Sequence, residues 1–355
     1  GNHRVATSPF HAISTASADA LDQLMADANP LFVVGASRSG TTLLARMLGQ
    51  HPDLAYLRES QFFDDLYPVR RLDDTIAVRT AQKVAQWLVD RTSVQPVDRA
   101  QLLAEFRTLF ASSNLTAAQT YNKTMSWLAS RSGKHTYIEQ TPRNVYYLQE
   151  LRRHFPEAFF ICMVRDPRGV VASQKRRWRQ RSLGAHKISS WETLRLWANY
   201  HPYTACHLWN KAADHILASR DESQLGLVRY EDLVISPEAC LRPVLARAGY
   251  SFLPEMLDVP LWGSSHVAHS SSPGVSSELV AQWRQVLSAT EQHIVVERCR
   301  AKMTALGYNE TDTPTSKTTG VHAATYPLHC LAVAALNPRR AWIQIRSLAS
   351  RPVRE

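Results

Sequence analysis

Short runs of apolar residues alternate along the chain with longer segments of helical periodicity. The runs are rich in β-branched and aromatic residues and too short for stable helices, so they predict buried strands. They lie at Leu31–Val34, Leu54–Leu57, Tyr137–Glu139, Ala158–Val164 and Leu225–Val228. Because helical segments separate them, the pattern predicts an α/β fold with a P-loop-like central parallel sheet flanked by helices.

The helical segments between the predicted strands differ in length. We expect one helix at Val145–Phe155 and a long one from Trp191 to Ile216. The pattern from about 64 to 131 is mainly helical, which predicts a helical insertion beside the sheet. A turn-rich polar segment at about 262–277 predicts a mobile loop.

We therefore predict a leader at 1–29, a central domain at 30–308 and a C-terminal extension at 309–355. The extension begins with a threonine-rich linker and ends in a mixed apolar and basic segment. Covering a substrate site, forming a dimer and touching a membrane surface all remain open as its role. Its few apolar residues favour local packing.

The charge balance adds information about partners. Lysine and arginine number 41 against 31 acidic residues, a net charge of +10. This excess suits a polyanionic cofactor or an acidic acceptor, and also nucleic acid or an anionic membrane. No apolar run approaches the roughly 18 residues of a membrane span, and the N-terminus has no signal-peptide pattern. We expect a cytoplasmic protein, with a removed leader or anchor left open.

The cysteines and histidines do not indicate a metal site. The five cysteines are widely scattered, and no cysteine or histidine pattern has metal-ligand spacing. We expect unpaired thiols in a reducing compartment. His266 or His269 could face an acceptor from the predicted mobile loop.

A glycine-bounded loop follows the first predicted strand. The sequence GASRSGTT at 35–42 runs directly into apolar residues at helical spacing. A strand, loop and helix of this kind form a phosphate cradle, because backbone N–H groups point inward and the helix N-terminus is partly positive. The general phosphate loop has a lysine where this chain has Thr41. Its absence argues against ordinary ATP or GTP hydrolysis and leaves Arg38 as the loop's only cation.

A second motif, RDPRGVVAS at 165–173, follows the most apolar strand. Arg165 ends the strand and Ser173 lies in the next helix, so that one anion can contact both. With these two motifs the chain resembles the sulfotransferases that use 3′-phosphoadenosine 5′-phosphosulfate (PAPS). In that family an R-S-G-T-T loop binds the 5′-phosphosulfate, and R-D-P-R-x-x-x-x-S is the 3′-phosphate signature. The resemblance covers Pro30 to Tyr308 and is similar to the tyrosylprotein, carbohydrate and bacterial enzymes.

The resemblance implies roles for individual residues. Arg38 would face the transferring sulfuryl group and stabilise charge on the departing phosphate. Glu59 would be the general base, since a glutamate follows H-P-D at this distance in the tyrosylprotein branch. Glu139 is a weaker candidate that we expect to be structural. The expected cofactor-binding residues are Gly35, Ser37, Arg38, Ser39, Gly40, Thr41, Thr42, Arg165, Ser173, Arg177 and Tyr230.

One position departs from the family. Many relatives have a lysine, in K-D-P or K-T-P, where this chain has Gln140. The chain must then use Gln140 as a neutral donor or recruit Arg143. A degenerate, non-catalytic sulfotransferase is an alternative that this departure raises.

The resemblance predicts a single displacement in which a sulfuryl group passes from PAPS to an acceptor hydroxyl, releasing PAP without a metal ion. Carbohydrate, glycolipid, tyrosyl peptide and natural-product acceptors all remain open, as does a homodimer. Nucleic acid is not expected as a partner.

Two other functional classes are alternatives. A P-loop nucleotide kinase predicts a loop lysine and magnesium dependence. A non-catalytic module that binds nucleotide or nucleic acid would use the basic segment Lys175–Arg181, and predicts strong salt-dependent affinity for DNA or RNA.

Overall fold

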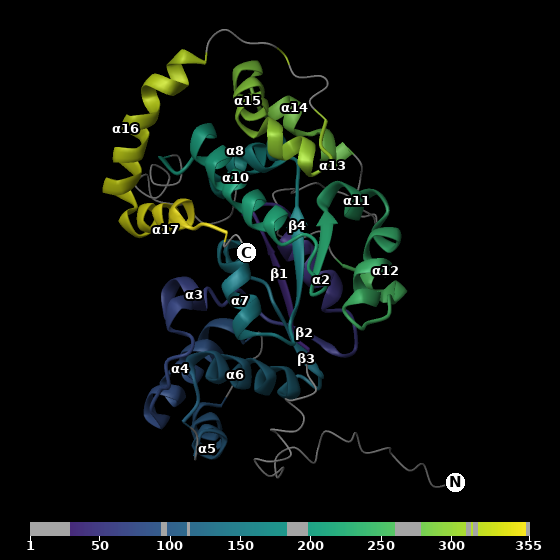
Figure 1. Cartoon of the computed structure of the whole chain (residues 1–355), viewed down its shortest axis with the longest axis vertical. Helices are drawn as coiled ribbons and strands as arrows, with labels where there is room; N and C mark the ends of the chain where they lie inside the picture. The colour runs from purple at the N-terminus through teal and green to yellow at the C-terminus, as the bar shows by residue number, and fades with distance from the viewer. Residues whose placement is uncertain are drawn as a thin grey trace.

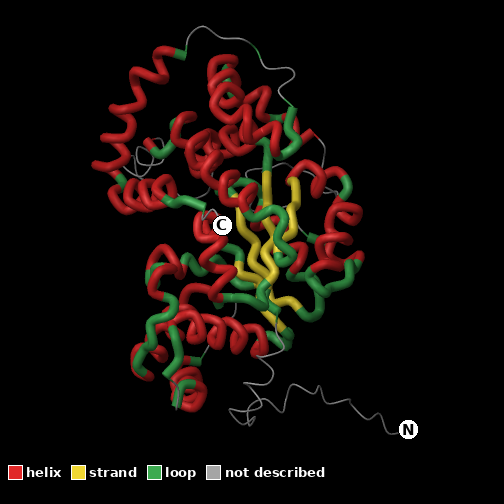
Figure 2. Tube along the Cα trace, viewed as in Figure 1, coloured by secondary structure: helices red, strands yellow, loops and turns green. Residues whose placement is uncertain are grey.

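The predicted α/β fold is confirmed by the computed structural model, in which helices flank a parallel sheet (Figures 1 and 2). It describes residues 29–93, 98–111, 114–182, 198–259, 278–309, 314 and 319–352, with the backbone alone at 177–182, 278 and 279. The strands are β1 (Leu31–Gly35), β2 (Leu54–Tyr56), β3 (Thr136–Glu139), β4 (Phe159–Val164) and β5 (Leu225–Arg229). Their order across the sheet is β2-β3-β1-β4-β5, and every pairing is parallel.

Both faces of the sheet are covered, as a strand with continuous apolar residues requires. Along β1, Phe32 and Val34 belong to one hydrophobic core, whereas Leu31 and Val33 belong to another. Successive side chains of a strand point to opposite faces, so the two cores lie on opposite sides of the sheet.

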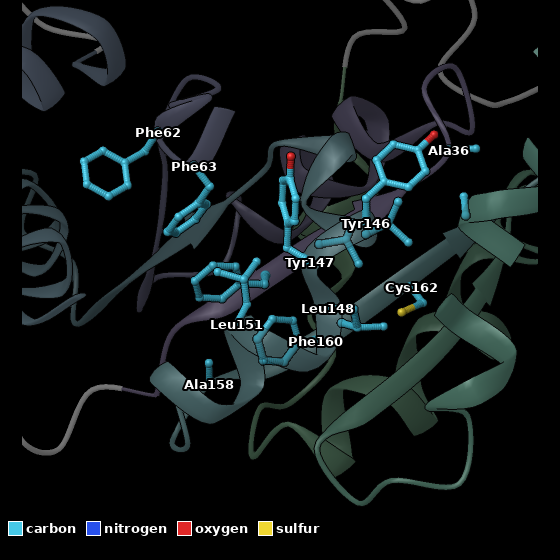
Figure 3. Close-up of a cluster of buried hydrophobic side chains, with 14 of the residues drawn as sticks. Ala36, Phe62, Phe63, Tyr146, Tyr147, Leu148, Leu151, Ala158, Phe160 and Cys162 are labelled. Carbon is cyan, nitrogen blue, oxygen red and sulfur yellow. The ribbon is translucent and has the colours of Figure 1, made fainter. Parts of the chain in front are cut away.

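The helices divide between these two cores. The core of Leu31 receives side chains from α2 (Thr41–Leu48), α11 (Tyr230–Ile235), α12 (Pro237–Arg247) and η4 (Pro254–Leu257). The core of Phe32 receives side chains from α3 (Phe62–Asp65), α4 (Val78–Thr92), α5 (Arg99–Leu109), α6 (Ala117–Arg131), η3 (Pro142–Tyr147), α7 (Leu148–His154), α8 (Pro167–Ser182), α10 (Pro202–Ala218), α14 (Trp283–Val286) and α15 (Ala289–Ala305). Figure 3 shows part of this second core, where Phe63 lies between Phe62 and the side chains of Tyr147 and Leu151.

The remaining helices are η2 (Val69–Arg71), α13 (Glu278–Ala281), α16 (Gly320–Leu336) and α17 (Pro338–Ala349). No described helix is long and apolar enough to cross a membrane. In Figure 1, α16 runs along the outer edge of the molecule and α17 turns back toward the body. The predicted leader, apart from Asn29, and the predicted mobile loop lie outside the described residues.

Two helix predictions were wrong in their boundaries. The helix expected at Val145–Phe155 is instead a 3-10 helix, η3, followed by α7, because Tyr147 has φ −123° and ψ 17°, outside the helical region. The long helix expected from Trp191 to Ile216 is not continuous, because Tyr200 and His201 are not helical and α10 begins at Pro202. Its expected part before Ala198 lies outside the described residues. Proline lacks the N–H that a continuing helix would need, and His201 Nδ1 accepts a hydrogen bond from the backbone N–H of Tyr203 at the new start.

Candidate active site

The predicted site residues gather at one edge of the sheet. Because neighbouring strands are parallel, the loops that follow β1, β3, β4 and β5 all leave at the carboxyl edge. The register pairs Gly35 with Met163 and Val164 with Arg229, so the phosphate loop starts beside the Arg165 motif. The strand order therefore brings together two motifs that are far apart in the sequence.

The backbone of the phosphate loop has a conformation that depends on its glycines. A Cβ atom on Gly35 would lie 2.3 Å from the Met163 carbonyl oxygen, so β1 and β4 approach too closely there for a side chain. Gly40 has φ 98°, in the left-handed region that favours glycine. Arg38 has φ 78°, which is unusual for a residue with a side chain and indicates backbone strain at this loop.

The loop leaves donors available for an anion. Gly40 is the N-cap of α2 and supplies no capping side chain, so the first N–H groups of the helix lack the usual cap. Ser39 is fully buried, and its hydroxyl has no hydrogen-bond partner among the described residues. Thr41 is buried, Thr42 is half-buried and Ser37 is exposed. Hydroxyl and backbone donors in this arrangement fit a phosphate group.

Arg165 is buried beside the loop and held from several directions. Its guanidinium Nη1 donates to the backbone oxygen of Arg38 at 3.1 Å, and its own carbonyl accepts from Trp209 Nε1 at 2.9 Å. A Cβ on Gly169 would lie 2.9 Å from Arg165 Nε, so the absence of a side chain there makes room for the guanidinium. These contacts hold the guanidinium of Arg165 in place against the loop.

A direct contact joins the two motifs. The Nε of Arg38 donates to the Oγ of Ser173 across 3.0 Å. Arg38 therefore extends from the loop after β1 to the serine of the Arg165–Ser173 motif. Its expected role opposite the transferring sulfuryl group stays a prediction.

The ring of Tyr230 packs against both Arg165 and the phosphate loop. The guanidinium carbon of Arg165 lies 4.1 Å from the centre of its ring, within range of a cation–π interaction. The same ring packs against the loop, because a Cβ on Gly40 would lie 2.5 Å from Tyr230 Cδ2. Burial raises the pKa of Tyr230, and the neighbouring Arg165 opposes that rise. The predicted residue Tyr230 thus contacts both Gly40 and Arg165.

A buried ionic network that the sequence did not reveal supports the Arg165 segment. The backbone N–H of Asp166 donates to Glu231 Oε1 at 3.0 Å, and Tyr308 donates its hydroxyl to Glu231 Oε2 at 2.9 Å. Arg168 pairs with Asp166 at 2.6 Å and lies 4.3 Å from the ring centre of Trp283. The Asp166–Arg168 pair lies within the RDPR motif, but the sequence analysis did not predict it. Nothing in the sequence linked Glu231 to Asp166.

Glu59 lies half-buried and accepts hydrogen bonds from two amides. Gln140 Nε2 donates to its Oε1 at 3.1 Å, and Gln61 Nε2 lies 3.4 Å from its Oε2. Arg91 in turn donates to Gln61 Oε1 at 2.7 Å. The departure at position 140 therefore contacts the residue expected to be the general base, and Gln140 itself is buried.

Glu139 lies deeper in the protein than Glu59. It is fully buried and accepts hydrogen bonds from Tyr121 at 2.6 Å, from Ser60 at 3.1 Å and from Asn144 at 3.2 Å. Burial raises the pKa of Glu139, and the hydrogen bonds that it accepts oppose the rise. Enclosed by these partners, it anchors the segment that carries Glu59, in line with the structural role expected for it.

Arg143 is engaged away from Glu59. Its Nε donates to Asp64 at 2.9 Å, and its Nη2 donates to Ser347 Oγ at 2.7 Å and to the carbonyl of Ile343 at 3.1 Å. The side chain of Arg143 thus joins the C-terminal helix α17 to α3.

Other predictions concern side chains that the structure does not describe. Those of Arg177, His266 and His269 lie outside the described part. Within the described part, no group of three or more His, Cys, Asp or Glu side chains could hold a metal ion.

The comparison with known protein families agrees with both motifs. A family model described as "Sulfotransferase family" matches residues 30–254, more than half of the chain. This chain belongs to the sulfotransferase family. The family assignment favours a sulfotransferase over the kinase alternative.

Individual relatives are distant. Nodulation protein NoeE of Sinorhizobium fredii (strain NBRC 101917 / NGR234) is 28% identical to this sulfotransferase over 312 residues, which are 80% of this chain and 68% of that protein. Two solved structures are a "Sulfotransferase Domain from the Curacin Biosynthetic Pathway" and a "Sulfotransferase Domain from the Synechococcus PCC 7002 Olefin Synthase". They are 19% and 22% identical, with TM-scores of 0.49 each. Each aligns with 79% of this chain, and the alignments cover 98% and 96% of those structures.

Proposed function

We propose that this sulfotransferase takes its sulfuryl group from PAPS, transfers it to a hydroxyl of the acceptor and releases PAP. The hydrogen bond between Arg38 and Ser173 carries the proposal, because it joins a loop suited to one anion to a side-chain pair suited to another. A donor with phosphate groups at both its 5′ and 3′ positions needs two such sites. ATP and GTP lack the 3′ phosphate and would use only one.

The residues present fit this donor. The uncapped N-terminus of α2 and the buried hydroxyl of Ser39 would hold the 5′ phosphate, together with Thr41 and Thr42. Arg165 and Ser173 would hold the 3′ phosphate, the arginine as an always-charged donor and the serine as a hydroxyl donor. Tyr230 would neighbour the adenine. PAPS supplies an activated sulfuryl group whose transfer needs no metal ion.

Glu59 would act as the general base that takes the proton of the acceptor hydroxyl. An alcohol or phenol is a weak nucleophile until a nearby base takes its proton, and a half-buried carboxylate can do so. Gln140 fixes one oxygen of that carboxylate by its hydrogen bond. Gln140 thereby acts as a neutral donor that orients Glu59, whereas Arg143 is committed to α3 and α17.

The acceptor belongs to one of several hydroxyl-bearing classes. Carbohydrate, glycolipid, natural-product and tyrosyl-peptide hydroxyls all meet the chemical requirement of Glu59. The proposal therefore concerns donor and reaction, and a screen with PAPS as donor would identify the acceptor.

Calorimetric titration with PAP and with ADP tests the proposal, since ADP lacks the 3′ phosphate. Wild type should bind PAP far more tightly, and Arg165→Ala should lose that preference. Arg220→Ala is the matched control, because Arg220 lies exposed just before β5, at the opposite edge of the sheet. Equal affinity of wild type for PAP and ADP would refute a 3′-phosphate site and with it the choice of PAPS.

A further inference from the structure

The C-terminal helix α16 presents its aliphatic side chains outward. Val321, Leu328 and Leu331 are 68%, 67% and 68% exposed, and Ala324 and Ala335 on the same stripe are exposed too. These positions follow one another at alternating spacings of three and four residues, so they lie along one side of the helix. In a globular protein, a helix normally packs such an aliphatic stripe against the rest of the fold.

The opposite side of α16 carries polar aromatic residues and contacts the body. Tyr326 and His329 lie 4.9 Å and 4.8 Å, between ring centres, from His201 on the capping turn of α10. Tyr326 is also 5.4 Å from Tyr203. The helix therefore packs through its polar aromatic side while its aliphatic side faces away.

The following helix α17 also exposes large apolar side chains. Trp342 and Ile345 are 60% and 58% exposed, whereas Ser347 on the inner side is buried and bonded to Arg143. We call Val321, Leu328, Leu331, Trp342 and Ile345 the outer apolar set. It lies on two helices that Figure 1 shows joined end to end at the edge of the molecule.

The charged residues of the segment that carries this set all have one sign. From residue 320 to residue 352 the chain has no aspartate or glutamate, and it has arginines at 339, 340, 346 and 351. One of these, Arg339, pairs with Asp65 at 2.5 Å while its side chain stays 69% exposed. Exposed aliphatic and tryptophan side chains beside arginines are typical of helices that lie in the interface of an anionic bilayer.

We propose that α16 and α17 form a docking surface for an anionic phospholipid membrane. The outer apolar set would enter the boundary between headgroups and acyl chains, and the arginines would contact lipid phosphates. The helices would lie on the bilayer and not cross it, in keeping with the length and hydropathy of the described helices.

Charge decides between a bilayer and a second copy of the chain. A two-fold dimer through this face would bring two sets of arginines together with no carboxylate of residues 320–352 to pair with them. An anionic bilayer supplies the missing negative charge. The surface is therefore complementary to lipid and not to itself.

Flotation of the full chain with lipid vesicles tests this proposal. Wild type should bind vesicles of phosphatidylcholine containing phosphatidylglycerol at least about tenfold better than vesicles of phosphatidylcholine alone, and added salt should weaken the binding. Leu328→Glu with Leu331→Glu should abolish it. Ile235→Glu is the matched control, because Ile235 is 61% exposed on α11 and outside the set. Circular dichroism and PAP titration of each variant confirm that it folds.

Two results would overturn the proposal. Wild type that binds neither kind of vesicle would exclude a lipid surface, and this comparison does not depend on any variant. A wild-type dimer that becomes a monomer in the double glutamate variant, with no vesicle binding, would assign the face to a second copy instead. Light scattering gives the mass in both cases. PAP affinity is measured separately, so failure here leaves the proposed donor untouched.

Discussion

The Nε atom of Arg38 lies 3.0 Å from the Oγ atom of Ser173 and donates a hydrogen bond to it. The two residues come from different motifs, one in the loop after β1 and the other on α8. Arg165 strengthens the same link by donating to the carbonyl of Arg38. The loop after β1 and the Arg165–Ser173 motif are therefore directly connected, and the proposed donor site that they would form has measurable consequences.

Arg38→Ala and Ser173→Ala should each weaken PAP binding by about tenfold, the loss expected for one hydrogen bond to a charged group. The double variant should lose less than the product of the two effects, because each single change already removes the shared contact. Calorimetry on the four proteins measures the coupling. Independent effects that simply multiply would contradict a shared site, and Ser173→Ala should leave ADP affinity unchanged.

Glu59→Gln should lower turnover by about 10²–10⁴-fold, the usual contribution of a general base. PAP affinity should stay as in wild type, since the change affects only proton transfer. Steady-state kinetics with an acceptor found by screening provide the measurement. Turnover equal to that of wild type would remove Glu59 from the role.

Gln140→Ala should have a smaller effect than loss of the base itself. The carboxylate remains but loses the hydrogen bond that orients it, so we expect about a tenfold fall in kcat with little change in the KM for the donor. Steady-state kinetics should show the lower kcat together with a nearly unchanged KM for the donor. An equal rise in KM would mean that Gln140 contacts the donor and not Glu59.

Gly40→Ala should both destabilise the fold and abolish PAP binding. The left-handed φ costs an alanine about 1 kcal/mol, and the new Cβ would also meet the Tyr230 ring at 2.5 Å. Gly249→Ala is the matched control, because Gly249 has φ 83° and nothing within 4 Å of the added atom. Urea unfolding and calorimetry should show backbone strain in both variants and loss of PAP binding in Gly40→Ala alone. Retained PAP binding there would show that the loop tolerates the displacement of Tyr230.

Glu139 should make stability depend on pH. Burial raises its folded-state pKa above the ordinary 4.5, so its favourable contribution is complete below that value and is lost as pH rises through the raised pKa. Glu139→Gln cannot ionise. Wild type should therefore lose stability relative to this variant as pH rises from about 4.5 toward 8. Urea unfolding across that range checks it, and a difference that stays constant with pH would mean that Glu139 does not titrate there.

Much of the fold followed from local sequence. Each strand is a short apolar run that cannot be anything but buried, and β4 appeared within one residue of its expected start. The phosphate loop was equally visible, because the need for glycine at Gly35 and Gly40 is a local backbone requirement. Such features can be predicted because their causes lie within a few residues.

Features made by distant residues could not be predicted. Glu231 accepts a hydrogen bond from the N–H of Asp166, and Trp209 donates one to the carbonyl of Arg165. The sequence separation of these pairs gives no sign that they are in contact. The contact between Gln140 and Glu59 has the same character. The expectation of local packing for the C-terminal extension held for α17 only in part, since its Ser347 side is buried while Trp342 is exposed.

By itself, the sequence determined the α/β class, the anion-binding loop after β1 and the arginine–serine motif after β4. Each depends on the periodicity, the glycines or the donors of one short segment. Only the tertiary structure decided that Arg38 reaches Ser173, that Gln140 holds Glu59 and that α16 faces outward with its aliphatic side. Those contacts depend on strand order and helix packing, which are set by the free energy of the whole chain and not by any one segment of it.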